Sequence, residues 1–332
     1  MARLSRPAAL TAALTLALGG GLVATSASAS APTGGVRAAT TATTPVVPFK
    51  RTSTYPVHQN LPAGVDPAAE TVAEISSVSP DGKTLAYTDA AGKRVGILDM
   101  SNPAAPKGLG SIDLSAIENA EPTSVSIIGG YLVVVVDTSA SYTDPSGRAI
   151  VYRLSDRTRV RTFQLGGQPD SIAVSQDGAY AAIAIENERD ESATPAYGTK
   201  GGLPQYPAGR IAVLDLARSP WRWAKNDVRL TAYSGAALAS LSEAGLDTPR
   251  DPEPEYVSIN GRNQLAVTLQ ENNGVVLIDL ATRKITKVFS VGNAKVTGID
   301  TAKDDPHPKT IPAALQAEAL ALLDAVLDQF VA

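Results

Sequence analysis

The sequence predicts an all-β fold, and three observations lead to this expectation. Apolar and polar residues alternate over short runs, which is the period of a half-buried strand. Tight Asp-Gly and Asn-Gly turns, as at Asp81-Gly82 and Asn260-Gly261, separate these runs. A set of four such runs recurs about every 45–50 residues. A repeated unit of four short strands is typical of a β-propeller blade, so we expect a β-propeller.

Four blades can be recognised, followed by a C-terminal helix. The expected strands are residues 74–79, 84–88, 95–99 and 110–114; 123–128, 131–136, 149–154 and 160–165; 171–175, 180–185, 210–216 and 227–230; and 256–259, 264–269, 274–280 and 284–291. Strands around 49–57 would make a fifth blade, and the whole would be an incomplete seven-bladed ring. Two insertions, 187–209 and 217–252, separate strands of the third and fourth blades, and 235–245 looks helical. A β-sandwich is the alternative architecture.

Both ends of the chain differ from this pattern. Residues 1–29 predict a signal peptide, with Arg3 and Arg6, a short apolar run and an Ala27-Ser28-Ala29 cleavage site. A membrane anchor is the alternative. The composition of 30–48 predicts a disordered linker before a propeller domain over 49–303. Residues 304–332 predict a Pro-interrupted tail with an amphipathic helix. We therefore expect a secreted or extracytoplasmic protein with no membrane span after signal cleavage.

Composition limits the chemistry of the chain. There are no cysteines, so thiolate metal sites and cysteine nucleophiles are excluded. The only histidines, His58 and His307, lie near opposite ends, which disfavours Ser-His and multi-histidine zinc mechanisms. The net charge of −4 and the lack of a dense basic stretch argue against nucleic acid as a partner.

Acidic and amide side chains recur at one position of the blade plan. The first two strands of a blade are antiparallel, so the start of one lies beside the end of the other. Both places carry polar or acidic residues in every unit, and we expect them to meet at one rim. The expected metal ligands are Glu253, Glu255, Glu271, Asp170 and Glu186, and the expected rim residues are Glu74, Glu121, Gln270, Asn272 and Asn273. Oxygen ligands of this kind suit Ca²⁺ or Mg²⁺. Solvated or turn-capping carboxylates are the alternative.

Several motifs resemble known secreted propellers. The sequence SPDGKTLAYT (79–88) looks like the repeat of YVTN/YncE-type propellers. The segments PEPEYVSI (252–259), VTLQENN (267–273) and VLIDLAT (276–282) resemble the choice-of-anchor I proteins and the "esterase-like activity of phytase" group. The resemblance covers residues 46–300. Members of these families usually continue for several more blades, so the chain looks truncated at its C-terminal end; a tail that covers an open edge is the alternative.

The leading functional prediction is a propeller that binds a small molecule, a metal ion or an extracellular protein at its acidic rim. The resemblance also implies a calcium-dependent phytase-like phosphoesterase, and a lactonase-like propeller hydrolase is a third alternative without specific residues. Catalytic residues are not identified. Phosphate could be held by the loop cations Arg189, Lys200, Arg210 and Arg250, and the aromatic residues of the insertions form either a binding lip or packing: Trp221, Trp223, Tyr197, Tyr206 and Tyr233.

Overall fold

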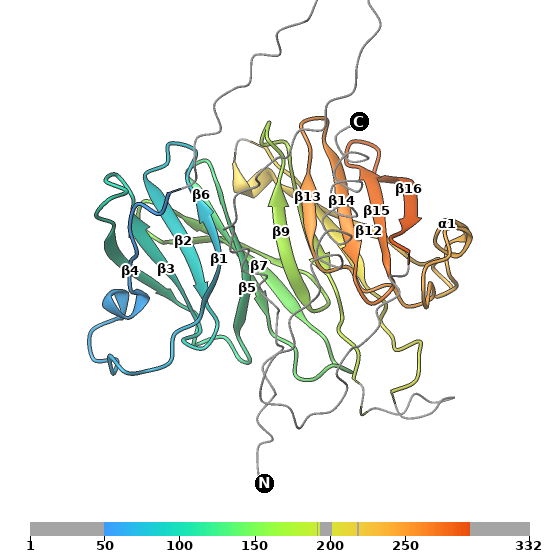
Figure 1. The fold of residues 1–332 in the computed structure, drawn as a ribbon, viewed down its shortest axis with the longest axis horizontal. Coiled ribbons are helices and arrows are strands. Elements are labelled where there is room, and N and C mark those ends of the chain that lie inside the picture. The colour runs from blue at the N-terminus through green and yellow to red at the C-terminus, as the bar shows by residue number, and fades with distance from the viewer. Residues whose placement is uncertain (1–49, 191, 193–200, 218, 293–332) are drawn as a thin grey trace, which may run out of the picture. The chain divides into compact units, whose positions relative to one another are not determined.

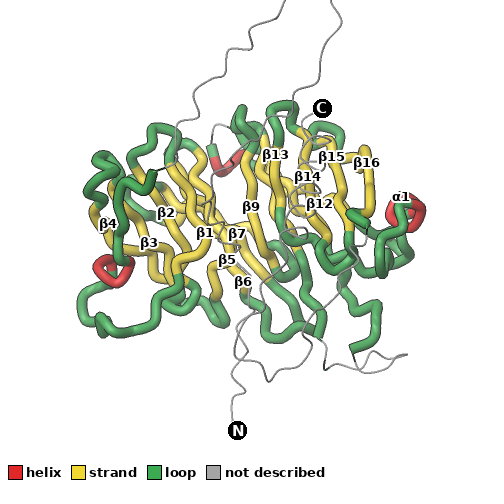
Figure 2. The backbone as a smooth tube through the Cα atoms, viewed as in Figure 1, coloured by secondary structure: helices red, strands yellow, loops and turns green. Residues whose placement is uncertain are grey.

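Four antiparallel sheets of four strands each make up the structure (Figure 1). The computed structural model describes residues 50–190, 192, 201–217 and 219–292. All four sheets lie in the part of the chain that follows Lys50. Strands dominate the described residues, with only short helical turns between them (Figure 2). The strands of each sheet follow one another in chain order, so each sheet is one blade, and the all-β propeller class is confirmed.

The blades are consecutive along the chain. Their strands are β1 (Ala73–Val78), β2 (Thr84–Asp89), β3 (Arg94–Asp99) and β4 (Lys107–Asp113); β5 (Glu121–Ile128), β6 (Tyr131–Asp137), β7 (Gly147–Arg153) and β8 (Arg159–Gln164); β9 (Pro169–Val174), β10 (Tyr180–Ile185), β11 (Arg210–Asp215) and β12 (Ala224–Arg229); and β13 (Val257–Ile259), β14 (Gln264–Leu269), β15 (Gly274–Asp279) and β16 (Lys284–Ser290). The helical turns of the described residues are η1 (Val57–Asn60), η2 (Pro220–Arg222) and α1 (Ala239–Glu243). Every strand predicted within 74–291 is present, and α1 lies inside the segment predicted to be helical.

The expected fifth blade is wrong for the described residues. Residues 50–56 form no strand, and η1 follows them. This segment instead packs on the first blade through Asn60, which is only 5% exposed. The Asn60 side-chain amide donates to the carbonyls of Ile97 (3.2 Å) and Gly110 (3.1 Å) and accepts from the Gly110 N–H (2.7 Å). The buried Asn60 amide thus satisfies backbone groups at the irregularity in the β3–β4 pairing.

Several predicted segments cannot be compared with the structure. The signal peptide (1–29), the linker (30–48) and the C-terminal tail with its helix (304–332) all lie outside the described residues. Within the described part of the chain, no helix combines the length and the apolar character needed to cross a membrane.

Side-chain hydrogen bonds fix the hairpin turns between the first two strands of a blade. In the first blade, the Ser79 hydroxyl donates to Asp81 Oδ1 (2.6 Å) and accepts from the Thr84 N–H (2.9 Å). Gly82 has a φ of +72°, a conformation that glycine adopts without a steric cost. The corresponding turn of the third blade repeats this arrangement. The Ser175 hydroxyl donates to Asp177 Oδ1 (2.7 Å) and accepts from the Tyr180 N–H (2.9 Å). The Asp-Gly turns of the sequence therefore set the register of these hairpins.

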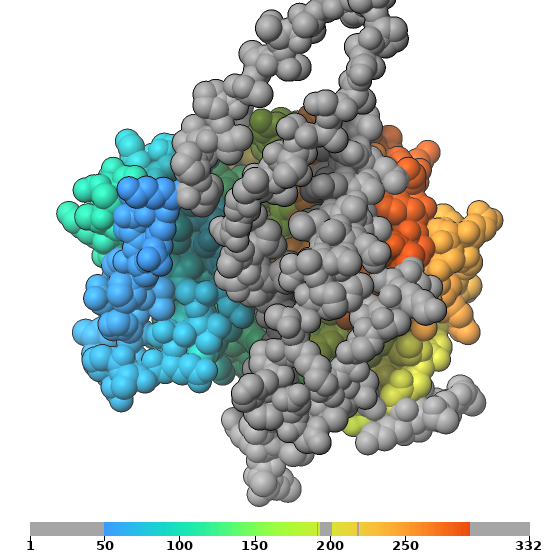
Figure 3. All heavy atoms as spheres, in the orientation of Figure 1, coloured from blue at the N-terminus to red at the C-terminus, as the bar shows by residue number. Residues whose placement is uncertain are grey.

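Alternate residues of the inner strands form separate cores between the blades. On β6, Val134 and Val136 pack in the core shared with the first blade, whereas Val133 and Val135 pack in the core shared with the third. All four side chains are fully buried. A third core joins the third and fourth blades. Because the first two of these cores cover both faces of β6, its sequence is a continuous run of valines. The first and fourth blades lie at opposite sides of the view in Figure 3.

The first strands of the blades bring the functional side chains together. Strands β1, β5, β9 and β13 contact one another in that order. Pairing irregularities fall at the first residues of β1, β5 and β9, and in β9 the residues opposite Ala184 are Asp170 and Ser171. A bulge of this kind redirects a side chain and ends regular pairing. The edge at which β1, β5 and β9 begin is therefore the place where irregular backbone presents acidic groups.

Candidate metal centre

Three glutamates form a compact carboxylate cluster between the third and fourth blades. Glu186 follows β10, Glu255 precedes β13, and Glu271 follows β14. One carboxylate oxygen from each lies within 4.8 Å of the others. Glu186 and Glu255 are partly buried, and Glu271 is exposed. The cluster is thus shielded from solvent at Glu186 and Glu255 and open to solvent at Glu271.

Backbone hydrogen bonds hold the three glutamates in place. The Glu186 N–H donates to the Gln168 carbonyl at 2.9 Å, and the Glu255 N–H donates to the Thr268 carbonyl at 3.1 Å. Glu271 lies in a tight turn, in which the Asn273 N–H donates to the Gln270 carbonyl at 3.0 Å. In addition, the hydroxyl of Ser171 donates to the Glu255 carbonyl, which joins the third blade to the fourth. These contacts fix the backbone and leave the carboxylates pointing at one another.

The cluster is electrostatically unfavourable when all of its carboxylates are ionised. Burial, reinforced by the charges of Asp170 and Glu255, raises the pKa of Glu186 to about 9. Burial and neighbouring acidic groups also raise the pKa values of Asp170 and Glu255, each to about 7. Two full negative charges at the 4.8 Å limit of the cluster repel by about 3.5 kcal/mol at an effective dielectric constant of about 20. A bound cation would remove this repulsion and lower all three pKa values.

The donor set determines which cation fits. It consists of carboxylate oxygens alone, which are the preferred ligands of Ca²⁺ and Mg²⁺. Ca²⁺ takes about 6–8 oxygen ligands, and the three carboxylates supply three when each binds through the one oxygen that lies within the cluster. A cation held here would therefore keep positions for water or for an oxygen of a bound ligand.

A comparison with known families identifies the chain at this point. The sequence profile described as "Choice-of-anchor I domain" matches residues 74–325, well over half of the chain. The chain belongs to the choice-of-anchor I domain family. No curated protein matches the sequence.

Several solved structures are similar to part of this choice-of-anchor I domain chain. A putative 6-phosphogluconolactonase from Bacteroides uniformis is 15% identical with a TM-score of 0.43, and the match covers 67% of this chain and 56% of that one. The β-propeller domain of Cps50 (Swd1) from Myceliophteria thermophila is 14% identical with a TM-score of 0.41, covering 67% and 59%. A chain of a nidogen/laminin complex is 16% identical with a TM-score of 0.39, covering 66% and 63%. The choice-of-anchor I chain thus spans less than two thirds of the length of these proteins.

Not every predicted ligand joins the cluster. Glu255, Glu271 and Glu186 are brought together, and Asp170 lies near enough for their charges to act on its pKa. Glu253 is separate, because its carboxylate forms an ion pair with Arg189 and also accepts from the Arg189 N–H at 3.3 Å. Its side chain is only 3% exposed. Glu253 is thus held as a structural ion pair and takes no part in the cluster.

The predicted rim residues have several different roles. Glu74 acts on the pKa of Asp170, so it lies within electrostatic range of the cluster. Glu121 pairs in register with Asp137 in the second blade, as expected from the antiparallel plan. Gln270 donates from Nε2 to Glu271 Oε1 at 3.4 Å and contacts the cluster directly.

The two asparagines after Glu271 shape the loop. Asn272 is fully buried, and its side-chain Nδ2 donates to the carbonyls of Asp247 and Asp251, each at 3.0 Å. Its Oδ1 accepts from the Glu253 N–H at 2.8 Å. Asn273 has a φ of +54°, a conformation that Asn tolerates better than most residues. We therefore interpret Asn272 as a structural residue that fixes the loop before β13.

Two features of the site are not apparent from the sequence pattern. Tyr256 is 49% exposed, and burial and the charges of Asp170 and Glu255 raise its pKa, so an aromatic ring lies beside the carboxylates. Asp251 forms the second half of the Arg189 ion pair, at 3.2 Å. The acidic motif around Asp251 is visible in the sequence, but its partner Arg189 comes from a distant insertion.

Proposed function

We propose that this choice-of-anchor I protein is an extracytoplasmic binding module that takes up Ca²⁺ at Glu186, Glu255 and Glu271. The observation that carries the proposal is the convergence of three carboxylate oxygens within 4.8 Å, two of them on partly buried side chains. Asp170 adds a fourth acidic group whose pKa is raised by the same neighbours. The family and the signal-like N-terminal sequence both support a place outside the cytoplasm.

The bound cation would also provide the ligand contact. Open coordination positions favour an oxygen-bearing small molecule or an acidic side chain of an extracellular protein as the remaining ligand. The rim residues Glu74 and Gln270 and the half-exposed ring of Tyr256 would then surround that ligand. The function proposed is therefore binding through a calcium ion.

A phytase-like phosphoesterase is supported less well by the same geometry. Such an enzyme needs basic side chains to hold a phosphate beside its cations. Arg189, the basic residue nearest in sequence to Glu186, is already paired with Asp251 and Glu253. Arg250 instead donates to the Tyr206 hydroxyl at 3.3 Å, and Lys200 lies outside the described residues. The lactonase-like alternative has no residue in its favour.

Thermal unfolding of the full chain with and without Ca²⁺ tests the proposal. A cation at one hundred times its dissociation constant adds about 2.7 kcal/mol to the free energy of unfolding. For a folded region of this size, that corresponds to a rise in melting temperature of about 5–10 °C. Glu255→Gln and Glu271→Gln should remove the rise, and Glu243→Gln, which neutralises an exposed carboxylate on α1, should keep it.

Two results would contradict the proposal. A wild-type melting temperature that neither Ca²⁺ nor Mg²⁺ changes would show that the cluster does not hold a cation. Calcium-dependent release of phosphate from p-nitrophenyl phosphate, lost in Glu255→Gln, would show that the protein is an enzyme and not only a binding module.

A further inference from the structure

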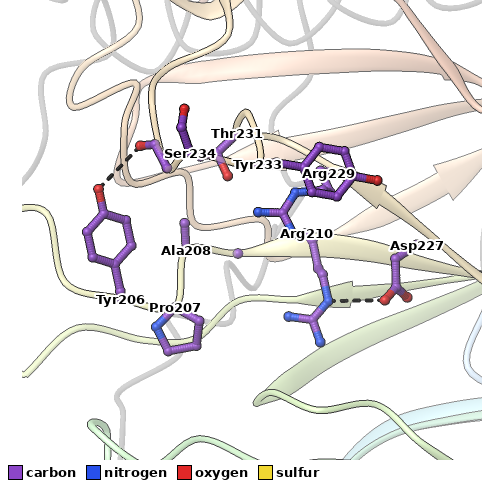
Figure 4. A pocket seen from close by; sticks show the side chains of 11 residues that line it. Tyr206, Pro207, Ala208, Arg210, Asp227, Arg229, Thr231, Tyr233 and Ser234 are labelled. Atoms are coloured by element: carbon purple, nitrogen blue, oxygen red, sulfur yellow. Dashed lines mark hydrogen bonds and ion pairs between the residues drawn. The ribbon is translucent and has the colours of Figure 1, made fainter.

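A cavity with a volume of about 640 Å³ lies in the third blade (Figure 4). Its wall combines the segment that leads into β11, the end of β12 and the turn that follows β12. The volume is in the range of sites for small organic ligands, which is about 300–1,000 Å³. No residue of the carboxylate cluster lines it among the described residues. The cavity is therefore a separate candidate site, and its argument does not depend on the proposed cation.

The cavity is positively charged in a chain of net charge −4. Arg210 and Arg229 are register partners on β11 and β12, so their side chains leave the same face of the sheet. Asp227 lies two residues before Arg229 on that face, 3.5 Å from Arg210 Nε and 2.8 Å from Lys225 Nζ. The Asp227 carboxylate thus forms ion pairs with both Arg210 and Lys225. In the described part of the chain, no carboxylate lies within 4.0 Å of the Arg229 guanidinium.

Arg229 is nevertheless held in a defined position. Its guanidinium carbon lies 4.7 Å from the centre of the Tyr233 ring, and its Nη2 donates to the Ala232 carbonyl at 3.4 Å. Stacking on an aromatic face orients a guanidinium without using its remaining N–H groups. These N–H groups stay available for an oxyanion, which a guanidinium binds in a bidentate manner.

Two tyrosine rings complete the cavity. Tyr233 is 92% exposed and Tyr206 is 53% exposed, although both rings carry a large apolar surface. Tyr206 is fixed by its hydroxyl, which donates to the Gly235 carbonyl at 3.2 Å and accepts from Arg250 at 3.3 Å. Figure 4 shows Tyr206 on one side of the cavity and Tyr233 beside Arg229 on another. Exposed, fixed aromatic faces of this kind are typical of recognition surfaces.

We propose that this cavity binds a hydroxylated carboxylate of the sugar-acid class, with Arg229 holding the carboxylate group. A single unpaired guanidinium matches one negative charge, whereas phosphate sites commonly gather several cations or backbone N–H groups. The ring faces of Tyr206 and Tyr233 provide apolar surface for the C–H face of a sugar, and the Ser234 hydroxyl at the exposed turn provides a polar contact. Arg210 adds positive charge but stays engaged with Asp227 and with the Leu165 and Gly166 carbonyls.

Calorimetric titration of the full chain with glucuronate, in the presence of a chelator, tests this inference. The chelator keeps the result independent of the carboxylate cluster. We expect saturable binding that Arg229→Ala weakens about tenfold or more, since a hydrogen bond to a charged group contributes about 1.5–3 kcal/mol. Arg229→Lys, which keeps the charge without the bidentate geometry, should lose part of the affinity. Tyr233→Ala should weaken binding about two- to tenfold through the lost ring contact.

The control substitution is Arg222→Ala, which removes an exposed positive charge outside the cavity and should leave the affinity unchanged. Unfolding curves should show that Arg229→Ala folds like the wild type, because the Arg229 side chain is exposed. Absence of glucuronate binding, or equal binding by Arg229→Ala, would refute the inference. Glucose binding as tightly as glucuronate would refute the role of the carboxylate. Tighter binding of inorganic phosphate would identify a phosphate site instead.

Discussion

Replacing Glu186 by Gln should stabilise the cation-free protein at neutral pH. The pKa of Glu186 is about 9 in the folded protein, compared with 4.5 for a glutamate in an unfolded chain. The folded chain therefore binds more protons than the unfolded chain between about pH 4.5 and pH 9. In this window the free energy of unfolding falls as the pH rises. The contribution of Glu186 to stability is therefore complete below pH 4.5 and is lost as the pH rises to 9. Gln has no proton to lose and removes this dependence.

The size of the effect follows from the same values. At pH 7, about 2.5 pH units above the unfolded pKa, each unit is equivalent to about 1.4 kcal/mol, which gives an upper limit of about 3.5 kcal/mol. Glu186 keeps some contact with solvent, and its neighbours titrate with it, so a gain of about 2 kcal/mol is a reasonable expectation. For a folded region of this size, a gain of that order raises the melting temperature by about 4–8 °C.

Thermal unfolding with a chelator at pH 5 and pH 8 measures this prediction. Glu186→Gln should melt above the wild type at pH 8 and close to it at pH 5, and added Ca²⁺ should narrow the difference at pH 8 by stabilising the wild type. Glu243→Gln, on the exposed helix α1, should show no pH-dependent gain. A Gln variant that is less stable than the wild type at both pH values would refute the electrostatic reasoning.

Three further substitutions test the framework around the site. Arg189→Met should lower the free energy of unfolding by about 3–5 kcal/mol in urea titrations, because Asp251 and Glu253 would be left buried without their cation. Ser175→Ala should cost about 1–2 kcal/mol by the same measurement, since it removes both the donor and the acceptor of the third-blade turn. Leu132→Ala should cost about 2–5 kcal/mol, because Leu132 is fully buried between the first two blades.

Matched controls separate these effects from nonspecific ones. Arg222→Ala removes an exposed arginine and Leu109→Ala an exposed leucine, and each should change the free energy of unfolding by less than about 0.5 kcal/mol. If Arg189→Met behaves like Arg222→Ala, the buried ion pair does not stabilise the loop before β13. If Leu132→Ala behaves like Leu109→Ala, the blades do not share the core described above.

The blade architecture follows from local sequence features, and for this reason it could be predicted. The turn that starts at Ser79 contains both its hydrogen-bonding side chains and its glycine within a few residues. The valine run of β6 indicates that both faces of this strand are buried, and the two cores confirm it. Residues 50–56 were misleading, because the segment forms no strand and the chain contacts the first blade through Asn60, which follows it. Asn60, which determines that outcome, bonds to groups 37 and 50 residues away.

The composition of the carboxylate cluster was predictable only in part. Antiparallel pairing is enough to bring the start of one strand beside the end of the next, and so to expect Glu255 near Glu271. It does not say which of two nearby glutamates turns towards the cluster. The partner that engages Glu253 is Arg189, 64 residues earlier and in an irregular insertion. The pairing irregularity at Asp170 has no signature in the alternation pattern either.

The contrast between Glu253 and Glu255 is the strongest argument that the cluster serves a cation. Both glutamates lie in the same short loop, and the fold supplies Arg189 to neutralise Glu253 together with Asp251. For Glu255, burial and the charges of Glu271, Asp170 and Glu188 all raise the pKa. Structural stability alone would favour a second arginine or an apolar residue at this position. An uncompensated group of carboxylates beside a compensated one is what a site for a divalent cation requires, because the cation itself provides the missing positive charge.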